Sequence, residues 1–245
     1  MPALIPEATQ IALLDRLLHR DLSNPEHKTN VHLHHQILYP QSTGYAHASS
    51  FFSQDSSTTF HPLDPAIHKA LTVAEFLQRK LRWLTLGGQY DWAAKCYPKE
   101  SFQPLFPADI GRLVKDLFPA TEAQAAIVNL YSPGDKLSLH RDVSEHCDQG
   151  LVSVSIGCDG IFIVGNSHDS EAAILRLRAG DVLYMTGPSR YAWHGIPRIL
   201  PKTCPELLAA WPAVASHQSP FNQWKGWMGE KRVNLNVRQM NNKVR

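Results

Sequence analysis

The amino-acid sequence predicts an α+β fold, with helices in the N-terminal half and a β barrel or jelly roll in the C-terminal half. Helical periodicity stops near residue 117, and eight short β-like runs follow. Turn signals such as Ser132-Pro133-Gly134-Asp135 separate these runs. Many short strands with little helix between them are typical of barrels and jelly rolls. The expected strands are Ala126–Tyr131, Lys136–His140, Leu151–Ile156, Ile161–Val164, Ala173–Leu177, Val182–Thr186, Tyr191–His194 and Val233–Gln239.

The first element is an amphipathic helix over residues 8–20. Ile11, Leu14, Leu17 and Leu18 recur at helical spacing and form one apolar stripe. Such a stripe is buried against other structure, so we expect this helix to pack on the outside of the β-rich half.

The rest of the N-terminal half reads as an arm followed by helices. Residues 41–60 are rich in Ser, Thr, Gln and Gly and predict a long loop or ordered arm. Residues 62–81 and 107–117 carry helical patterns, whereas residues 200–230 are an insertion rich in Pro and Trp.

A chain of 245 residues can bury the core of one domain that carries an extension. We therefore expect a single domain over residues 1–245. Residues 1–80 would form its helical extension and arm, and residues 81–245 its catalytic core.

The composition excludes several classes of protein. With 43% hydrophobic residues, 19% charged residues and no membrane-length apolar run, the chain is typical of a globular protein with no membrane partner. The N-terminus lacks the pattern of a secretory signal. The scattered cysteines argue against disulfides or a thiolate zinc site, and for an intracellular setting in nucleus, cytoplasm or mitochondrion. They are Cys96, Cys147, Cys158 and Cys204.

The charge pattern is compatible with a nucleic-acid partner but does not establish one. The net charge is only +2. Basic residues gather at Arg79, Lys80 and Arg82 and again in residues 225–245. Such runs are usually solvated faces, although phosphate contacts use the same residue types.

A candidate metal site lies in the β-rich half. His140 and Asp142 are two residues apart on an extended segment, so their side chains point to the same face. With His194 on a later strand they would form a facial triad of two histidines and one carboxylate. This donor set, with open coordination positions, is typical of non-haem iron(II) oxygenases.

The sequence contains a second copy of the same tripeptide, at His19-Arg20-Asp21. That copy lies at the end of the first helix, where residues two apart do not face each other. We therefore expect His140 and Asp142, and not His19 and Asp21, to bind a metal.

Near the C-terminus a strand alternates between polar and apolar residues. Arg232, Asn234, Asn236 and Arg238 share one face of it. A polar face is usually a solvated one, but an arginine fork also pairs bidentately with a carboxylate. 2-Oxoglutarate has a carboxylate at each end, so this face is a candidate co-substrate site.

Asn129 and Tyr131 lie two apart on the strand before the metal motif. Either residue alone is more often a core or edge residue. On one face of a strand beside the metal motif, both could donate hydrogen bonds to the same co-substrate.

Taken together, these motifs resemble the AlkB family of nucleic-acid dealkylases. All of them occur in the order that the family uses, across roughly residues 80–240. Residues 81–97 are similar to the eukaryotic branch nearest to the bacterial enzyme. The motifs are Asn129-Leu130-Tyr131, Ser132-Pro133-Gly134-Asp135, His140-x-Asp142, Ser189-Arg190-x-x-x-His194-Gly195-Ile196 and Arg232-Val233-Asn234-Leu235-Asn236-Val237-Arg238.

The resemblance implies a double-stranded β-helix that binds Fe(II) and 2-oxoglutarate and uses O2. His140, Asp142 and His194 would hold the iron, and Arg232 would grip the distal carboxylate of 2-oxoglutarate. The expected reaction hydroxylates an N-methyl group on a base of DNA or RNA and releases formaldehyde, succinate and CO2. The base must be single-stranded or flipped out of its stack. The residues that would assist Arg232 are Asn129, Tyr131, Asn234 and Arg238.

Three further residues are candidates for binding the methylated base. Trp83 and Tyr90 lie near Gly87-Gly88, a candidate for a mobile nucleotide-recognition lid near residues 81–100. Glu145 lies three residues beyond Asp142. Aromatic residues are more often core, and an acid is more often solvated, so these are the weakest of the predicted contacts. The histidines of residues 32–35 resemble a metal site only superficially, and we interpret them as an exposed strand or arm.

Two other functions remain open from the sequence. The same cofactors could serve a hydroxylase of a protein or small molecule, or the chain could be a nucleic-acid-binding module without activity. The second is disfavoured because an inactive copy has no chemical reason to keep both the triad and Arg232. We expect a monomer.

Overall fold

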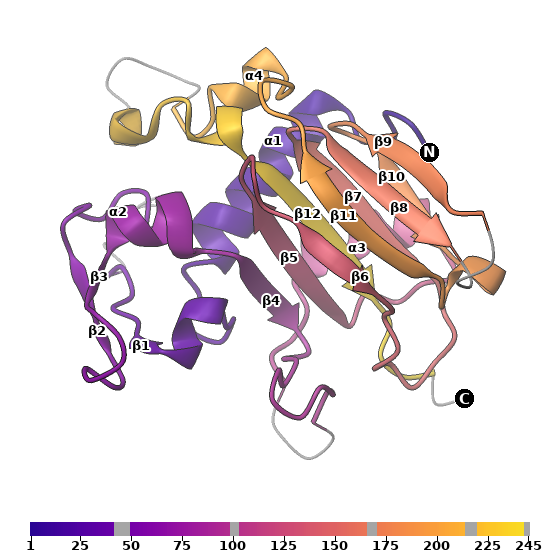
Figure 1. The fold of residues 1–245 in the computed structure, drawn as a ribbon, viewed down its shortest axis with the longest axis horizontal. Helices are drawn as coiled ribbons and strands as arrows, with labels where there is room; N and C mark the ends of the chain where they lie inside the picture. Colours follow the sequence, from indigo (N-terminus) through magenta and orange to yellow (C-terminus); the bar gives the residue numbers. More distant parts are fainter. Residues whose placement is uncertain (42–49, 99–102, 166–170, 214–219, 243–245) are drawn as a thin grey trace.

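A computed structural model of the chain describes residues 1–41, 50–98, 103–165, 171–213 and 220–242. Two antiparallel sheets face each other, and a smaller unit of strands and helices lies beside them (Figure 1). The two sheets form the jelly-roll core that the sequence predicts.

The larger sheet has five strands in the order β10-β7-β12-β5-β4. Its central strand, β12, pairs with β5 on one side and β7 on the other, so Arg232 lies opposite both Tyr131 and Gly157. Val233, Leu235 and Val237 are buried on the apolar face. The strands are β4 (Trp83–Gly87), β5 (Ala125–Tyr131), β7 (Leu151–Gly157), β10 (Val182–Met185) and β12 (Arg232–Arg238).

The smaller sheet has four strands in the order β6-β11-β8-β9. Its inner face meets the inner face of the larger sheet around Phe162, Leu177, Ile196 and Met185. The strands are β6 (Leu137–His140), β8 (Gly160–Gly165), β9 (Ala173–Leu177) and β11 (Trp193–Ile199).

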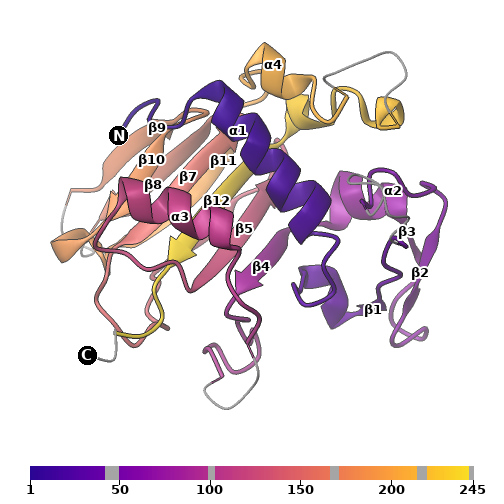
Figure 2. The same cartoon turned by 180° about the vertical axis from the view of Figure 1, so that it is seen from behind.

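Helices cover the outer face of the larger sheet, as Figure 2 shows. Helix α1 (Glu7–Leu14) continues as a π-helical stretch to Asp21, and α3 spans Ala108–Leu117. Leu14, Leu17 and Leu18 are fully buried against the sheet's apolar side, which confirms the amphipathic helix. The helix expected over residues 107–117 is confirmed by α3.

The unit beside the core differs from the prediction. A helix was expected over residues 62–81, but only α2 (Val73–Glu75) and the π-helical Phe76–Lys80 are helical. Of the preceding residues, Pro62, Leu71 and Thr72 belong to a three-stranded sheet, and residues 63–70 form the connection between two of its strands. A capping box between Thr72 and Glu75 starts the helix. Part of the arm expected over residues 41–60, residues 42–49, lies outside the described residues. The small sheet contains β1 (His35–Gln36), β2 (Thr59–Pro62) and β3 (Leu71–Thr72).

The insertion of residues 200–230 contributes to the core. Trp211, Trp224 and Trp227 are buried, and each indole N–H donates a hydrogen bond. Its short helices are α4 (Glu206–Ala209) and two 3-10 turns (Asn222–Trp224 and Trp227–Glu230). The acceptors of these tryptophans, on Asp15, Phe52 and Leu77, connect the insertion to the N-terminal half of the chain.

Candidate active site

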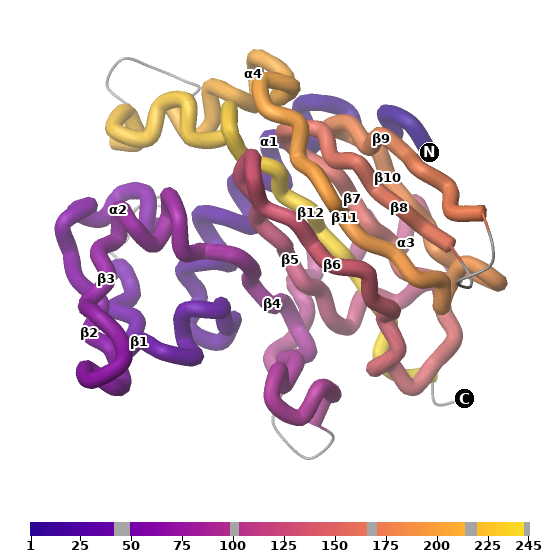
Figure 3. The backbone as a smooth tube through the Cα atoms, in the orientation of Figure 1, coloured from indigo at the N-terminus to yellow at the C-terminus, as the bar shows by residue number. Residues whose placement is uncertain are grey.

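A cavity of about 340 Å³ lies between the two sheets. Figure 3 shows that the chain after β4 and the chain after β6 leave the sheets at the same end. Residues from both segments, Tyr90, Trp92 and Ser144, line the cavity. The structure also brings every predicted metal and co-substrate residue to its wall: His140, Asp142, His194, Asn129, Tyr131, Arg232, Asn234 and Arg238.

The metal candidates meet where β6 pairs with β11. His140 lies directly opposite His194, and one ligand atom from each of His140, Asp142 and His194 lies within 4.8 Å of the others. The Nε2 atoms of His140 and His194 are 3.9 and 3.8 Å from the Asp142 carboxylate oxygens. The arrangement therefore presents three donor atoms to one point.

Backbone carbonyls set the orientation of both imidazole rings. Nδ1 of His140 lies 2.9 Å from the Ser138 carbonyl oxygen, and Nδ1 of His194 lies 3.0 Å from that of Ala192. A ring that donates from Nδ1 keeps the Nε2 lone pair free, which is the tautomer that binds a metal. The donor set thus fits an iron(II) ion at the Nε2 side.

Gly195 allows β6 to come this close to the end of β11. A Cβ atom on Gly195 would lie 2.8 Å from the Leu137 carbonyl oxygen, closer than side-chain carbons normally approach. The pairing of the two strands is also irregular between His194 and Ile196. A glycine directly after His194 is therefore part of how the triad is assembled.

Positive charge stabilises the carboxylate of the triad. Burial by itself would raise the pKa of Asp142, but Arg238 and the two histidines outweigh it and hold the pKa below its usual value. Arg238 Nη2 lies 3.4 Å from Asp142 Oδ2, and the Asn236 side chain donates to the same oxygen at 3.2 Å. Asp142 is thus kept ionised, as a metal ligand must be.

Arg232 is fully buried, and its neighbours are neutral. Its Nη1 donates to the Cys158 carbonyl at 3.1 Å, and its Nη2 donates to Ser155 Oγ at 2.8 Å. Among the residues that the structure describes, no carboxylate forms an ion pair with it. Burial lowers the pKa of Arg232 to about 10, so the side chain stays charged at neutral pH.

An unbalanced cation of this kind fits a negatively charged ligand. The Nε of Arg232 is buried without a hydrogen-bond partner among the described residues, and so is the Nε of Arg238. Burying a charge is costly unless it is paired. A dicarboxylate such as 2-oxoglutarate would supply the missing charge inside the cavity.

The remaining co-substrate candidates surround the same space. Asn234 donates to Ser153 Oγ and to the Val154 carbonyl, which fixes its amide on the cavity wall. Burial raises the pKa of Tyr131, so its hydroxyl remains a donor. Asn129 lies opposite Asn234 in the β5–β12 pair. These groups can orient a carboxylate that Arg232 neutralises.

Glu145 lies behind the cavity and not on its wall. Its side chain is fully buried between Arg190 and Arg238, with carboxylate oxygens 2.9 and 3.0 Å from their guanidinium nitrogens. Arg190 also donates to the Asp142 carbonyl at 2.7 Å. The expected contact of Glu145 with a base does not fit this burial, because both oxygens are already used. Its placement fits a positioning role for the residues around Asp142.

The mouth of the cavity is aromatic. Tyr90 and Trp92 line it, and Trp92 stacks on Trp83 at 4.6 Å between ring centroids. Trp83 belongs to β4, so the strand itself is part of the sheet and the candidate lid begins only after Gly87. The structure thus places Tyr90 at the mouth and Trp83 behind Trp92.

The second H-x-D tripeptide has a structural role. The His19 ring stacks on Phe221 at 4.4 Å and its Nδ1 lies 2.7 Å from Ser50 Oγ, so it is a core histidine. Asp21 is buried and pairs with Arg20. Among the histidines of residues 32–35, His32 lies in a 3-10 helix, His34 in the turn after it and His35 in β1.

Sequence reasoning missed several residues around the cavity. Ser155 holds Arg232, Arg190 holds Glu145, and Trp92 covers Trp83. Ser155 could have been found from strand alternation, because Ser153 and Ser155 share one face of the predicted strand Leu151–Ile156. Nothing in the sequence shows that Arg190 reaches Glu145.

Comparison with known proteins agrees with this geometry. The family described as the 2OG-Fe(II) oxygenase superfamily matches residues 30–238. The chain belongs to this superfamily. It is therefore a 2-oxoglutarate-dependent dioxygenase that uses Fe(II), 2-oxoglutarate and O2, and the cofactor prediction is confirmed.

Individual relatives identify the family of this oxygenase within the superfamily. The N6-methyladenosine RNA demethylase ALKB1 of Pyricularia oryzae is 47% identical over 98% of this chain and 73% of its own length. The tRNA demethylase abh1 of Schizosaccharomyces pombe is 38% identical over 94% of this chain and 74% of its own. These matches show that the oxygenase belongs to the AlkB family, as its motifs indicate.

A solved structure supports the fold of this oxygenase. The structure of OsALKBH1 covers 97% of this chain and 94% of its own, with a TM-score of 0.59 at 20% identity. At that identity the likeness supports the jelly-roll fold alone. Within the described residues, no helix has the length and apolar character needed to cross a membrane.

Proposed function

We propose that this oxygenase removes methyl groups from nitrogen atoms of bases in nucleic acid. One observation carries the proposal: the triad and the unpaired, buried Arg232 face one cavity whose mouth is lined by Tyr90 and Trp92. Tyr90 and Trp92 are in edge-to-face contact, with ring centroids 4.9 Å apart, so a flat base would stack against this aromatic pair and not between its rings. A base-modifying enzyme must receive a base that has left its stack.

Each residue then has a defined task. His140, Asp142 and His194 would hold iron(II) through Nε2, a carboxylate oxygen and Nε2, and Arg232 would neutralise the distal carboxylate of 2-oxoglutarate. When bound, the metal and co-substrate would supply the oxidation that converts N–CH3 to N–CH2OH. One oxygen atom of O2 goes to the new hydroxyl group and the other goes to succinate, while 2-oxoglutarate loses CO2. The hydroxymethyl group leaves as formaldehyde and the nitrogen regains a proton.

The protein supplies the geometry of that reaction. Asn129, Tyr131 and Asn234 would orient the co-substrate, and Arg238 would keep Asp142 ionised. Tyr90 and Trp92 would hold the base with its methyl group toward the triad. This division uses every polar group on the cavity wall that the sequence predicts.

RNA is the substrate class that the relatives favour. The relative at 47% identity is named for N6-methyladenosine in RNA, and the one at 38% is named for tRNA. A hydroxylase of proteins or small molecules is the second candidate, since the triad and Arg232 would serve it equally.

The test is a panel of oligonucleotides incubated with iron(II) and 2-oxoglutarate and analysed by mass spectrometry. The panel contains 1-methyladenine, 3-methylcytosine and N6-methyladenine in single-stranded RNA and DNA. We expect a loss of 14 Da from at least one RNA, the mass of one CH2 in the exchange of methyl for hydrogen, with stoichiometric succinate. Turnover of 2-oxoglutarate with a peptide or amino acid, and with no oligonucleotide, would replace this proposal by the second candidate.

A further inference from the structure

The outer face of the smaller sheet carries an exposed tryptophan beside the cavity mouth. Because His194 points inward on β11, strand alternation places Trp193 on the outside. Arg141 directly follows the last residue of β6 and is exposed. Trp193 is 41% exposed, and the Arg141 guanidinium carbon lies 5.1 Å from its ring centroid. Arg141 also lines the cavity, so it connects this indole to the mouth.

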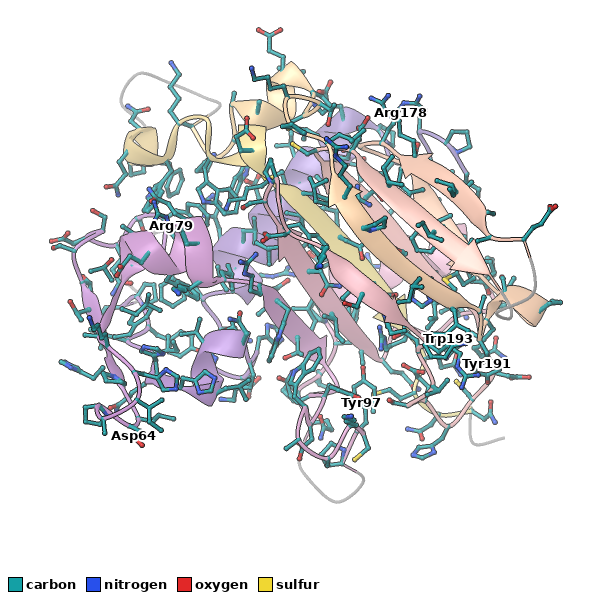
Figure 4. The ribbon with its side chains drawn as sticks, viewed as in Figure 1. Asp64, Arg79, Tyr97, Arg178, Tyr191 and Trp193 are labelled. Carbon is teal, nitrogen blue, oxygen red and sulfur yellow. The ribbon has the colours of Figure 1, made fainter. Side chains whose placement is uncertain are left out.

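A second exposed ring lies next to it. Tyr191 is 43% exposed, and the guanidinium of Arg190 packs over it at 4.9 Å. Arg190 is held by Glu145, so the tyrosine ring has a fixed support. Figure 4 shows Tyr191 and Trp193 close together at the start of β11. We call Arg141, Tyr191 and Trp193 the rim platform.

Trp193 is exposed, whereas other tryptophans of the chain are buried in the core. Three of the six tryptophans, Trp211, Trp224 and Trp227, are buried with their N–H groups bonded. Opposite Trp193 on β8 stands Gly165, which has no side chain to cover the indole. A Cβ at Gly165 would make only ordinary contact with Ala172, at 3.6 Å from its Cβ, so a covering side chain is sterically acceptable there.

The platform also carries the positive charge of Arg141. Within the described parts of the chain, no carboxylate pairs with Arg141. A cation over a partly exposed aromatic ring matches a nucleotide, whose base stacks and whose phosphate is anionic. A purely apolar partner would leave the guanidinium without a counter-charge.

We propose that the rim platform binds the nucleotide that flanks the methylated one on a single strand. Its base stacks on Trp193 beside Tyr191, and its phosphate lies against Arg141. This inference rests on the proposed function and extends it, because the flanking nucleotide would be held outside the cavity while the methylated base enters it.

The test compares two ligands that differ in length. One is a fluorescently labelled RNA pentanucleotide with a central methylated base, and the other is the same methylated mononucleotide. Binding of the first is measured by anisotropy and of the second by competition. We expect Trp193→Ala to weaken pentanucleotide binding by about tenfold and mononucleotide binding by less than about twofold, because only the longer ligand reaches the indole.

Two further variants control for structure. Trp193→Phe retains a stacking ring and should recover most of the pentanucleotide affinity. Ile174→Ala removes a 66% exposed side chain on β9, two strands away from β11 in the same sheet, and should change neither affinity. Iron-dependent stabilisation of each variant reports whether the neighbouring His194 is still in place.

Each remaining outcome contradicts the rim platform in its own way. Equal loss for both ligands means that Trp193 acts through His194. Unchanged pentanucleotide affinity removes the platform, and a wild-type dimer that Trp193→Ala converts to monomer makes this face a contact between copies. If the wild type demethylates the mononucleotide but Trp193→Ala binds the pentanucleotide normally, only this inference fails. If the wild type demethylates neither ligand, the proposed function fails with it.

Discussion

At the scale of single residues, the nitrogen that donates its proton decides what a histidine can do. Carbonyl acceptors at Ser138 and Ala192 occupy Nδ1 of His140 and His194 and leave Nε2 for a metal. His19 has a similar partner at Nδ1, but its ring stacks in the core. The same residue type in the same tripeptide therefore has a different role because of its surroundings.

This difference can be measured. We expect His140→Ala and His194→Ala to reduce turnover of 2-oxoglutarate to below about one hundredth of wild type, because each removes a metal ligand. His19→Ala should lower the melting temperature and leave the rate per folded molecule near normal. A rate loss in His19→Ala as large as in His140→Ala, at equal folded fraction, would contradict the assignment of the metal site.

Arg232 gives a second test at this scale. We expect Arg232→Lys to weaken 2-oxoglutarate binding tenfold or more, about 1.5–3 kcal/mol, because lysine keeps the charge but not the bidentate fork. The exposed Arg178, labelled in Figure 4, provides the control in Arg178→Lys. Calorimetric titration without oxygen gives both affinities. If Arg232→Lys binds 2-oxoglutarate as tightly as Arg178→Lys does, another residue binds the distal carboxylate, and Arg238 is the first to test.

Wild type and Arg232→Lys should also differ in how 2-oxoglutarate binding depends on pH. The pKa of Arg232 is lowered by burial only to about 10, so binding to the wild type should be level from pH 7 to pH 9. Burial lowers the pKa of a lysine from a smaller starting value, and its charge is lost as pH rises. Binding to Arg232→Lys should therefore weaken across this range, and a level profile in the variant would show that its ammonium stays charged.

At the scale of elements, the sequence predicted most strands because their patterns are local. The polar and apolar alternation of β12 is visible in seven residues and was confirmed. Strand β4 was missed because its pattern is short and mostly apolar: Thr85 is the one polar residue from Trp83 to Leu86, and it is buried like Leu84 and Leu86. The burial of Glu145 depends on arginines 45 and 93 residues away in the chain, which no local pattern shows.

Gly160 on strand β8 leaves the space that the Arg232 side chain occupies. A Cβ on Gly160 would lie 2.9 Å from Arg232 Nε and 3.1 Å from its Cζ. We expect Gly160→Ala to displace the guanidinium and weaken 2-oxoglutarate binding by about 1–3 kcal/mol, the usual cost of overpacking. Gly165→Ala on the same strand meets only ordinary contacts and is the matched control. Identical co-substrate affinity in the two variants would show that Arg232 adapts freely.

At the scale of the whole molecule, a net charge of +2 spread over 245 residues offers no general attraction for nucleic acid. Affinity must then come from local groups. Arg82, which the sequence offered as a phosphate contact, is paired with Asp135. Arg79 lies on the unit beside the core, far from the end of β11 in Figure 4. Arg141 lines the cavity and is exposed, so it is available to a phosphate.

Salt dependence separates these contributions. Each phosphate contact to a single strand contributes a slope of about −0.7 in a plot of log affinity against log salt concentration. We expect Arg141→Gln to flatten the slope for a methylated single-stranded RNA by about that amount, and Arg79→Gln to leave it unchanged. Trp92→Ala should weaken binding at every salt concentration with the wild-type slope, because stacking releases no counterions. Anisotropy titrations between 50 and 200 mM salt, about a fourfold range, resolve such a change. If Arg79→Gln flattens the slope while Arg141→Gln does not, the strand crosses the unit beside the core and not the rim of the cavity.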